Sequence, residues 1–385
     1  MGAFWLSLLG AVVVLLLIVW PFSRLDWVRR VPRAPRLLAI GAGVGYGLLG
    51  RIVFGFGYAD WHPRLPGWLS GLLPSLSASF SVMSLSFLFL LPMVIGFLDQ
   101  RAPDPVARKR PVLRAFFAPM VPVLLMLALT AVLSIEGALC IAMALPAFLF
   151  FAGVGGWLGL AARRNSPKSS QSGGISLMIA LPFLFAPVEQ HVAFAVEQRQ
   201  VENTVHVRAA PSVVWREIKS VRAIAVSELS LRVSHVIGLP RPIEATLSRD
   251  GVGGVRMATF ERGLTFRETV TDWQPERRLS FQIAAEPAPK TALDEHVAVG
   301  GAYFDVLDGT YELVPLADGS TLLKLTSHQR LSTHFNFYAR LWTDFIMSDL
   351  QSSIMDVIRN RCERATSAPV GRPAVGAATS SSPSL

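Results

Sequence analysis

Six apolar runs occupy the first half of the chain, and each is long enough to cross a bilayer as an α-helix. Residues 2–20 hold no charged side chain, lack a basic segment before them and lack a small-residue cleavage site after them. They therefore predict a transmembrane helix rather than a cleaved signal peptide. The runs predict an α-helical membrane domain over residues 1–196, with spans at residues 2–20, 37–57, 72–98, 116–135, 138–160 and 175–195.

Positive charge is concentrated in this same half. Residues 1–196 hold 15 Lys and Arg against 6 Asp and Glu, whereas residues 197–365 hold 20 against 21. The net charge of +9 therefore belongs to the membrane half, where the basic residues lie in loops. The balanced second half has no basic run, so the sequence predicts no nucleic-acid partner.

The basic residues also mark one set of loops. Loops 21–36, 99–115 and 161–174 hold thirteen Lys and Arg, whereas the alternate loops hold only Arg64. By the positive-inside rule, the first set is cytoplasmic. We therefore predict an integral plasma (inner) membrane protein whose N-terminus and C-terminal domain are extracytoplasmic. This topology requires segment 175–195 to cross fully, and the alternative is a re-entrant or interfacial segment.

Several residues of the membrane half predict packing or polar contacts. Arg51 either reaches the headgroups or pairs with a carboxylate. Glu136, in a tight turn, is predicted to be solvated. Glu189 is predicted to mark the outer end of the last span, and the alternative is a polar site inside the bundle. Two overlapping GxxxG patterns predict close helix packing at Gly41, Gly43, Gly45 and Gly47.

The second half is organised around its last helix, predicted over residues 335–364. Its apolar residues recur at helical spacing over about eight turns, and its other faces are too charged for a membrane span. We predict an antiparallel sheet of about seven strands wrapped on this helix, forming a domain at residues 200–365. A disordered tail is predicted at residues 366–385. The predicted strands are residues 202–208, 243–249, 254–262, 264–273, 277–285, 309–316 and 320–331.

Three segments and the last helix resemble a known superfamily. The segments are APSVVWREI, GVGGVRMATFERGLTFRETVTDWQPERRLSF and YELVPLADGSTLLKLTS. Together with the helix they resemble the SRPBCC superfamily, the START/Bet v1-like group that includes polyketide cyclase/dehydrase and lipid-transport proteins. The resemblance covers about 165 of 385 residues. It implies a helix-grip fold, in which a curved sheet grips the C-terminal helix around an apolar cavity for a hydrophobic ligand. It implies no particular reaction, because the superfamily carries binders, cyclases and hydrolases on one scaffold.

Strand alternation predicts the wall of such a cavity. Glu268 lies between Phe266 and Val270 on the face predicted to meet the helix. A carboxylate there is costly unless it is paired. It is therefore either a polar anchor or acid for a ligand, or a structural group held by a neighbouring Arg or Tyr. The predicted cavity residues are Phe266, Glu268, Phe281, Tyr311, Trp342 and Phe345, and Trp342 has the alternative role of a core residue.

Motifs of catalysis and metal binding are missing from the sequence. No HxH, HExxH or CxxC spacing predicts a metal site, and no GxSxG or Cys/His pattern predicts a nucleophile. We therefore expect no metal and no cofactor, and assign no catalytic residue. Cys140 and Cys362 are predicted in separate domains, so no disulfide is expected.

Three functions are compatible with this sequence. The leading one is a membrane-anchored START-like module that binds a hydrophobic small molecule or lipid beside the bilayer. The second is a cyclase/dehydratase-type enzyme acting on a bound polyketide or isoprenoid, and the third is a membrane scaffold or sensor. An enzyme requires several convergent polar groups in the cavity. The sequence offers one, Glu268, which favours binding over catalysis.

Overall fold

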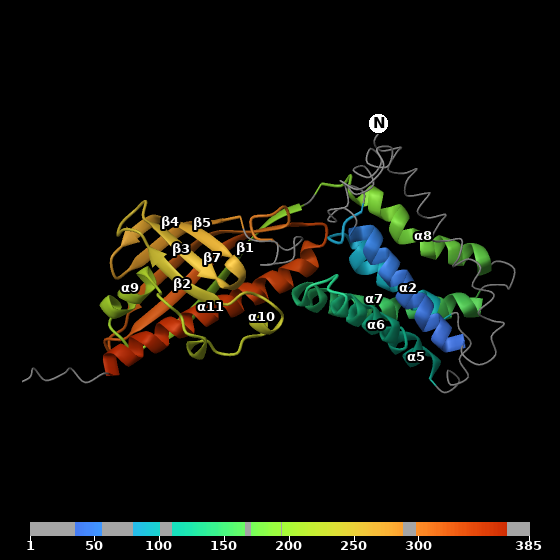
Figure 1. Ribbon diagram of the computed structural model, residues 1–385, viewed down its shortest axis with the longest axis horizontal. Helices are drawn as coiled ribbons and strands as arrows, with labels where there is room; N and C mark the ends of the chain where they lie inside the picture. Colours follow the sequence, from blue (N-terminus) through green and yellow to red (C-terminus); the bar gives the residue numbers. More distant parts are fainter. Residues whose placement is uncertain are drawn as a thin grey trace, which may run out of the picture.

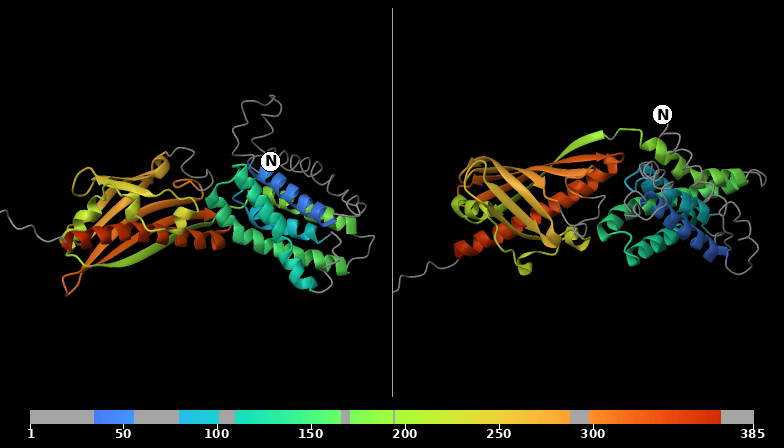
Figure 2. Two further views of the ribbon diagram at one scale, coloured as in Figure 1. Left: turned by 60° about the horizontal axis from the view of Figure 1, so that its bottom comes forward. Right: turned by 45° about the horizontal axis from the view of Figure 1, so that its top comes forward.

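The computed structural model describes residues 35–55, 80–100, 110–165, 171–193, 195–287 and 298–367. The predicted span 2–20 and nearly all of the predicted tail 366–385 lie outside the described residues. Within them the chain forms a helical region, residues 35–193, and a second part at residues 195–367 in which a sheet lies on one long helix (Figures 1 and 2). The long helix points its first turns at the helical region.

The helical region contains fewer long apolar helices than the sequence predicts. Three are long and apolar enough to cross a membrane: Arg36–Gly55, Pro111–Val132 and Ala138–Asn165. Two more are apolar but shorter, Ser86–Asp99 and Ile175–Glu189, so six spans are not confirmed. The helices are α2 (Pro35–Gly55), a π-helical turn η4 (Ser86–Leu90), α4 (Leu91–Asp99), α5 (Pro111–Phe117), α6 (Met120–Val132), α7 (Ala138–Asn165) and α8 (Gln171–Glu189).

Glycines bring these helices into close contact. A Cβ atom added at Gly155 or Gly156 of α7 would collide with the backbone carbonyl of Met93 or Ala115, respectively. In α2, by contrast, Gly43 and Gly47 face neighbouring side chains, whereas Cβ atoms at Gly41 and Gly45 would meet nothing within 4 Å. Only one of the two predicted GxxxG patterns therefore lies at a helix contact, since the two patterns occupy different faces of α2.

The second part is a single antiparallel sheet, in agreement with the prediction. Its strand order is β1-β7-β6-β5-β4-β3-β2, and every neighbouring pair is antiparallel. The sheet and its long C-terminal helix fit the helix-grip fold, and we call residues 195–367 the grip domain. The strands are β1 (Ala195–Val207), β2 (Pro242–Leu247), β3 (Val255–Phe260), β4 (Thr265–Gln274), β5 (Arg278–Ala285), β6 (Phe304–Pro315) and β7 (Thr321–Thr333).

The long helix, α11 (Asn336–Ser367), crosses the concave side of the sheet (Figure 2). Its second half packs tightly, because Met355, Val357, Ile358 and Cys362 join strand residues in one buried cluster. Two short helices lie beside the second half of α11, α9 (Pro211–Lys219) and η7 (Val226–Glu228). Two others lie nearer the helical region, α10 (Val233–Val236) and η8 (Glu261–Gly263), since a Cβ atom added at Gly238, just after α10, would meet Ala138 of α7.

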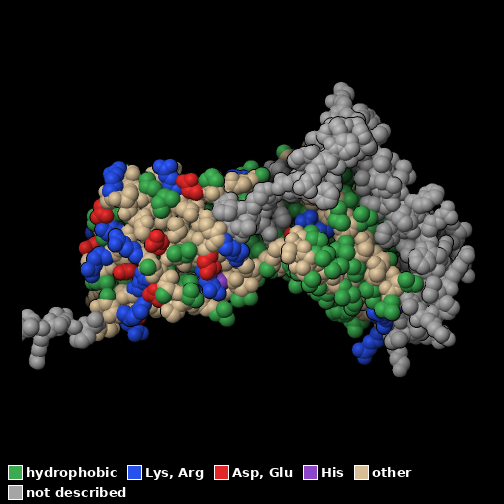
Figure 3. Space-filling model, viewed as in Figure 1, with side chains coloured by type: hydrophobic (Ala, Val, Ile, Leu, Met, Phe, Trp, Pro, Cys, Tyr) green, Lys and Arg blue, Asp and Glu red, His purple; other side chains and the backbone are tan. Residues whose placement is uncertain are grey.

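The two parts differ in surface chemistry. Charged side chains of both signs are spread over the visible face of the grip domain, whereas hydrophobic side chains gather over the helical region (Figure 3). Exposed apolar side chains of this region include Leu125 and Leu129 of α6 and Phe150 of α7. A broad apolar surface of this kind is suited to contact with lipid or with another protein rather than with water.

An ion-pair cluster fastens the far end of α11. Arg361 donates to both carboxylate oxygens of Glu228, at 2.9 and 2.7 Å, and Arg364 adds a third hydrogen bond of 2.8 Å. The hydrogen bond from Arg361 is the main reason that the pKa of Glu228 falls from 4.5 to about 2. A carboxyl whose pKa is lowered by folding stabilises the fold above its unfolded pKa, and this contribution is lost as the pH falls through the folded value.

We therefore expect the free energy of unfolding to fall between about pH 4.5 and pH 2 more steeply in the native chain than in Glu228→Gln. Urea unfolding monitored by fluorescence across this pH range would measure both slopes. At neutral pH the variant should be less stable than the native chain. If the free energy of unfolding had the same value and the same pH dependence in both proteins, the ion-pair cluster would not contribute to stability.

Candidate functional site

A cavity of about 160 Å³ lies between the sheet and α11. We call it the grip cavity. Four of the residues predicted to line a cavity do line this one: Phe266, Glu268, Phe281 and Tyr311. They come from three consecutive strands, β4, β5 and β6, and side chains alternate along each strand. Residues from β3 and from α11 complete the wall, among them Arg256 and Gln351.

A buried ion pair forms the main polar group of the grip cavity. Arg256 and Glu268 lie directly opposite each other on β3 and β4. The Arg256 guanidinium donates to the Glu268 carboxylate, and both residues are less than a tenth exposed. The guanidinium also lies 5.6 Å from the centre of the Phe281 ring. Glu268 is therefore a structural group held by a neighbouring arginine, which was the second of its two predicted roles. It also lines the cavity.

Burial sets the protonation behaviour of this group. Burial raises the pKa of Glu268, and the adjacent Arg256 offsets part of that rise. Burial alone would lower the pKa of Arg256, but Glu268 and Tyr311 outweigh it, so the pKa of Arg256 is raised. Burial likewise raises the pKa of Tyr311. The cavity therefore holds a permanent cation and a neutral phenol beside one carboxyl.

Two side chains that line this cavity each carry a buried polar atom without a hydrogen-bond partner among the described residues: the Arg256 Nε–H and the Gln351 amide oxygen. The amide nitrogen of Gln351 does have a partner, because it donates to Ser327 Oγ at 2.7 Å. Leaving buried polar atoms unpaired costs free energy. The polar side chains of Arg256, Glu268, Tyr311 and Gln351 thus interrupt a mainly apolar wall.

The two remaining predicted cavity residues lie elsewhere. Phe345 is 42% exposed and lines neither the grip cavity nor a second cavity, and Trp342 is half-buried and lines that second cavity. The helical period explains both positions. The α11 residues that line the grip cavity are Ile346, Met347, Leu350, Gln351 and Ile354. Phe345 points away from this stripe, on the same face as the exposed Leu341.

The second cavity, of about 190 Å³, lies where α11 meets the helical region. We call it the junction cavity. Its wall includes Met126 and Leu127 of α6, Leu139 of α7 and the first turns of α11, including Tyr338. The Tyr338 hydroxyl donates to the carbonyl of Met143 at 2.5 Å and so ties α11 to α7.

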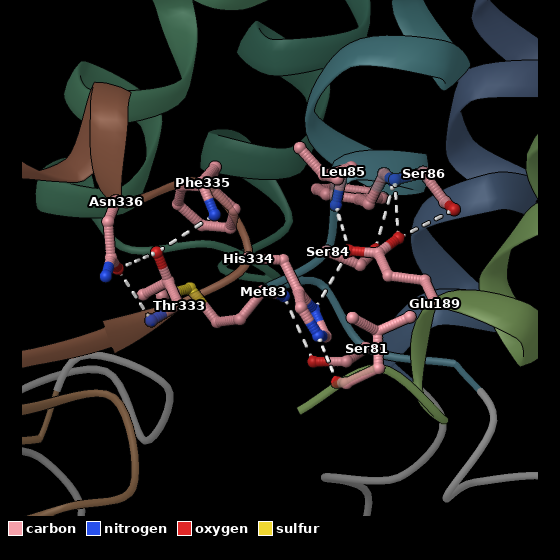
Figure 4. A network of polar contacts seen from close by, with 12 residues as sticks. Ser81, Met83, Ser84, Leu85, Ser86, Glu189, Thr333, His334, Phe335 and Asn336 are labelled. Carbon is pink, nitrogen blue, oxygen red and sulfur yellow. Dashed lines mark hydrogen bonds and ion pairs between the residues drawn. The ribbon is translucent and has the colours of Figure 1, made fainter. Parts of the chain in front are cut away.

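Buried polar contacts hold the helical region and the grip domain together (Figure 4). Glu189, at the end of α8, accepts hydrogen bonds from the backbone of Leu85 at 2.6 Å and of Ser86 at 3.1 Å. Its carboxylate also lies 3.2 Å from His334, in the turn between β7 and α11. Glu189 is only 3% exposed, so the prediction that it marks an exposed helix end is wrong. It belongs instead to a polar site inside the molecule, which was the alternative prediction.

Glu136 is likewise not solvated as predicted. It forms an ion pair with Arg51 of α2, in which both side chains are about a tenth exposed. The pair lines the junction cavity. Sequence separation explains the error, since the partner lies 85 residues away and only the bundle brings the two together.

Other reactive groups are few in the described part of the chain. It contains no group of three or more His, Cys, Asp or Glu side chains that could hold a metal ion. Both cysteines are free, and burial is the main reason that the pKa of Cys362 rises to about 12. A thiol with that pKa is protonated at neutral pH and is a poor nucleophile.

Sequence reasoning missed Arg256 and Gln351. The signal for Arg256 was present, because alternation in β3 places it on the same face as Ala258 and Phe260, both buried. The signal for Gln351 was weaker, since one polar residue within an apolar stripe of α11 is compatible with either face.

No family model matches the sequence, and no curated protein matches it significantly. Solved structures with low similarity align with the grip domain. Norcoclaurine synthase from Thalictrum flavum is 15% identical, with a TM-score of 0.29, and the match covers 45% of this chain and 99% of that one. The Zhui aromatase/cyclase from Streptomyces sp. R1128 is 17% identical, with a TM-score of 0.30, covering 46% and 100%. The Aha1 protein from Colwellia psychrerythraea is 13% identical, with a TM-score of 0.25, covering 43% and 96%. At this similarity the helix-grip fold is assigned from the strand order and long helix of the chain itself.

Proposed function

We propose that this chain is a membrane protein whose grip domain binds a lipid or another apolar molecule bearing a hydroxyl or carbonyl group. The observation that carries the proposal is the grip cavity, whose mainly apolar wall includes the polar side chains of Arg256, Glu268 and Gln351. Apolar walls supply affinity, and a few placed polar groups supply orientation. The apolar surface and long apolar helices of the helical region support an anchor in the bilayer.

The size of the cavity limits what it holds. A dry cavity of about 150 Å³ takes a molecule the size of benzene, and the grip cavity of about 160 Å³ is similar. One ring or a short chain segment therefore fits inside it as it stands. Arg256 would donate to the ligand oxygen, and Gln351 would accept from a ligand hydroxyl.

Binding is better supported than catalysis. An acid catalyst must release its proton to the substrate, but the carboxyl of Glu268 is fixed against a guanidinium. Arg256 offsets only part of the rise that burial causes in the pKa of Glu268, so it is this fixed pairing, and not the pKa, that opposes acid catalysis. The cyclase/dehydratase alternative would need a second polar group to act on the substrate, and the clearest candidate among the cavity residues is Tyr311.

A photoactivatable long-chain fatty alcohol tests the proposal on the purified full chain. We expect labelling of grip-cavity peptides, weaker by about tenfold or more in the double variant Arg256→Met/Glu268→Leu, because a hydrogen bond to a charged group is worth about 1.5–3 kcal/mol. The matched control is Arg278→Met/Glu312→Leu, which removes an exposed ion pair from the same sheet. Labelling confined to the helical region, or equal in all three proteins, would refute the proposal.

A further inference from the structure

Five apolar residues line both the grip cavity and the junction cavity: Leu239, Val299, Phe304, Ile346 and Met347. A residue that lines both cavities lies where the two adjoin, so the cavities are neighbours that share these five residues. We infer that the two cavities are compartments of one passage, through which an apolar ligand moves between the helical region and the grip cavity. This inference rests on the proposed function.

A ridge of α11 side chains runs from one cavity to the other. Tyr338, Trp342 and Ile346 line the junction cavity at intervals of four residues. Ile346, Leu350 and Ile354 continue the same row in the grip cavity. Residues four apart are neighbours on a helix surface, and a row at this spacing is inclined to the helix axis. From Tyr338 to Ile354 this inclined row spans about 24 Å along the axis, which suits a long lipid tail better than either cavity alone.

The side chains between the two cavities can change rotamer. Met347 belongs to a small apolar cluster against which Val299 and Phe304 pack, and methionine has three rotatable bonds. Leu239 and Val299 lie outside the helices and strands. Opening a path between the cavities therefore needs rotation of side chains and leaves the hydrogen bonds of the sheet and of α11 intact.

The far end of the passage lies close to the apolar outer surface. Met126 and Leu127 of α6 line the junction cavity, while Leu125 and Leu129 of the same helix are 50% and 36% exposed. One helix thus separates the cavity from the surface that we assign to lipid. The passage is apolar in its middle, and each compartment holds an Arg–Glu pair, Arg51–Glu136 in one and Arg256–Glu268 in the other. An amphipathic lipid with an oxygen-bearing head would be held at either end.

The rate of filling tests the passage. The full chain is reconstituted into phosphatidylcholine vesicles, the photoactivatable fatty alcohol is added to the bilayer, and labelling of grip-cavity peptides is followed in time. Leu239→Trp and Val299→Trp each add bulk between the two cavities. We expect filling about tenfold slower, corresponding to a modestly higher barrier; because both residues also line the grip cavity, each rate is taken relative to that variant's own final extent of labelling. Val252→Trp, at a 58% exposed position far from these side chains, is the matched control.

Variants with smaller side chains between the cavities provide a second test if a tryptophan variant is poorly folded. Leu239→Ala and Val299→Ala should fill the grip cavity at least as fast as the native chain. Native filling rates in both folded tryptophan variants, or slower filling in the alanine variants, would overturn the passage while leaving binding intact. An absence of grip-cavity labelling in the native chain would instead refute the proposed function.

Discussion

Replacing Glu268 with alanine should lower the stability of the grip domain by about 3–5 kcal/mol, because the change leaves the Arg256 guanidinium buried without its counter-charge. Arg256 is 4% exposed and has little access to water. Its Nε–H already has no partner among the described residues. Thermal unfolding of the purified full chain, followed by calorimetry, would measure the loss.

Two comparisons isolate the buried charge as the cause. Glu312→Ala breaks an ion pair with Arg278 that is about a third to a half exposed, and it should cost less than about 1 kcal/mol. The double variant Arg256→Met/Glu268→Leu removes both charges and should recover most of the stability lost by Glu268→Ala, since apolar replacements of buried pairs are often neutral or stabilising. Equal losses for Glu268→Ala and Glu312→Ala would show that Arg256 finds another partner or water.

The position of Glu268 shows what strand alternation can predict. A period of two assigns each residue of β4 to one face, and the hydrophobic neighbours Phe266 and Val270 identify that face as the inner one. Alternation does not predict the partner. Arg256 pairs with Glu268 because β3 and β4 adopt one register, and register depends on turn geometry and on the packing of the whole sheet.

The helical stripe of α11 shows a different limit. Helical spacing predicted one buried face over the whole helix, but only its second half packs fully on the sheet core. The first turns leave the sheet and meet the helical region, where Trp342 lines the junction cavity and Leu341 and Phe345 are exposed. A periodic pattern predicts an apolar face but does not reveal which partner covers each turn of it.

Hydropathy predicted the membrane half less well, for a related reason. Among the described residues of the predicted span 72–98, the helix begins near Ser86, and residues 80–84 before it are not helical. Its start is instead held by hydrogen bonds to Glu189, over a hundred residues away in sequence. Hydropathy records how apolar a segment is, but where a helix begins here depends on such long-range polar contacts.

A second large loss of stability is expected from substitutions where α7 packs against neighbouring helices. Gly156→Ala should destabilise the helical region by about 1–3 kcal/mol or more, because the added methyl group would collide with the Ala115 carbonyl and force α5 and α7 apart. Gly155→Ala should do the same through the carbonyl of Met93 in α4. The rigid backbone on the other side of each contact leaves no flexible side chain to move away.

Gly45→Ala in α2 is the matched control for Gly155→Ala and Gly156→Ala. It makes the same chemical change within an apolar helix, but the new methyl group would meet nothing within 4 Å. Alanine is a better helix former than glycine, by about 1 kcal/mol, so this variant should be as stable as the native chain or more stable. Thermal unfolding of the detergent-solubilised full chain compares all three variants. If Gly156→Ala and Gly45→Ala had the same melting temperature, close backbone packing would not hold α7 in place, and the junction cavity beside it would need another support.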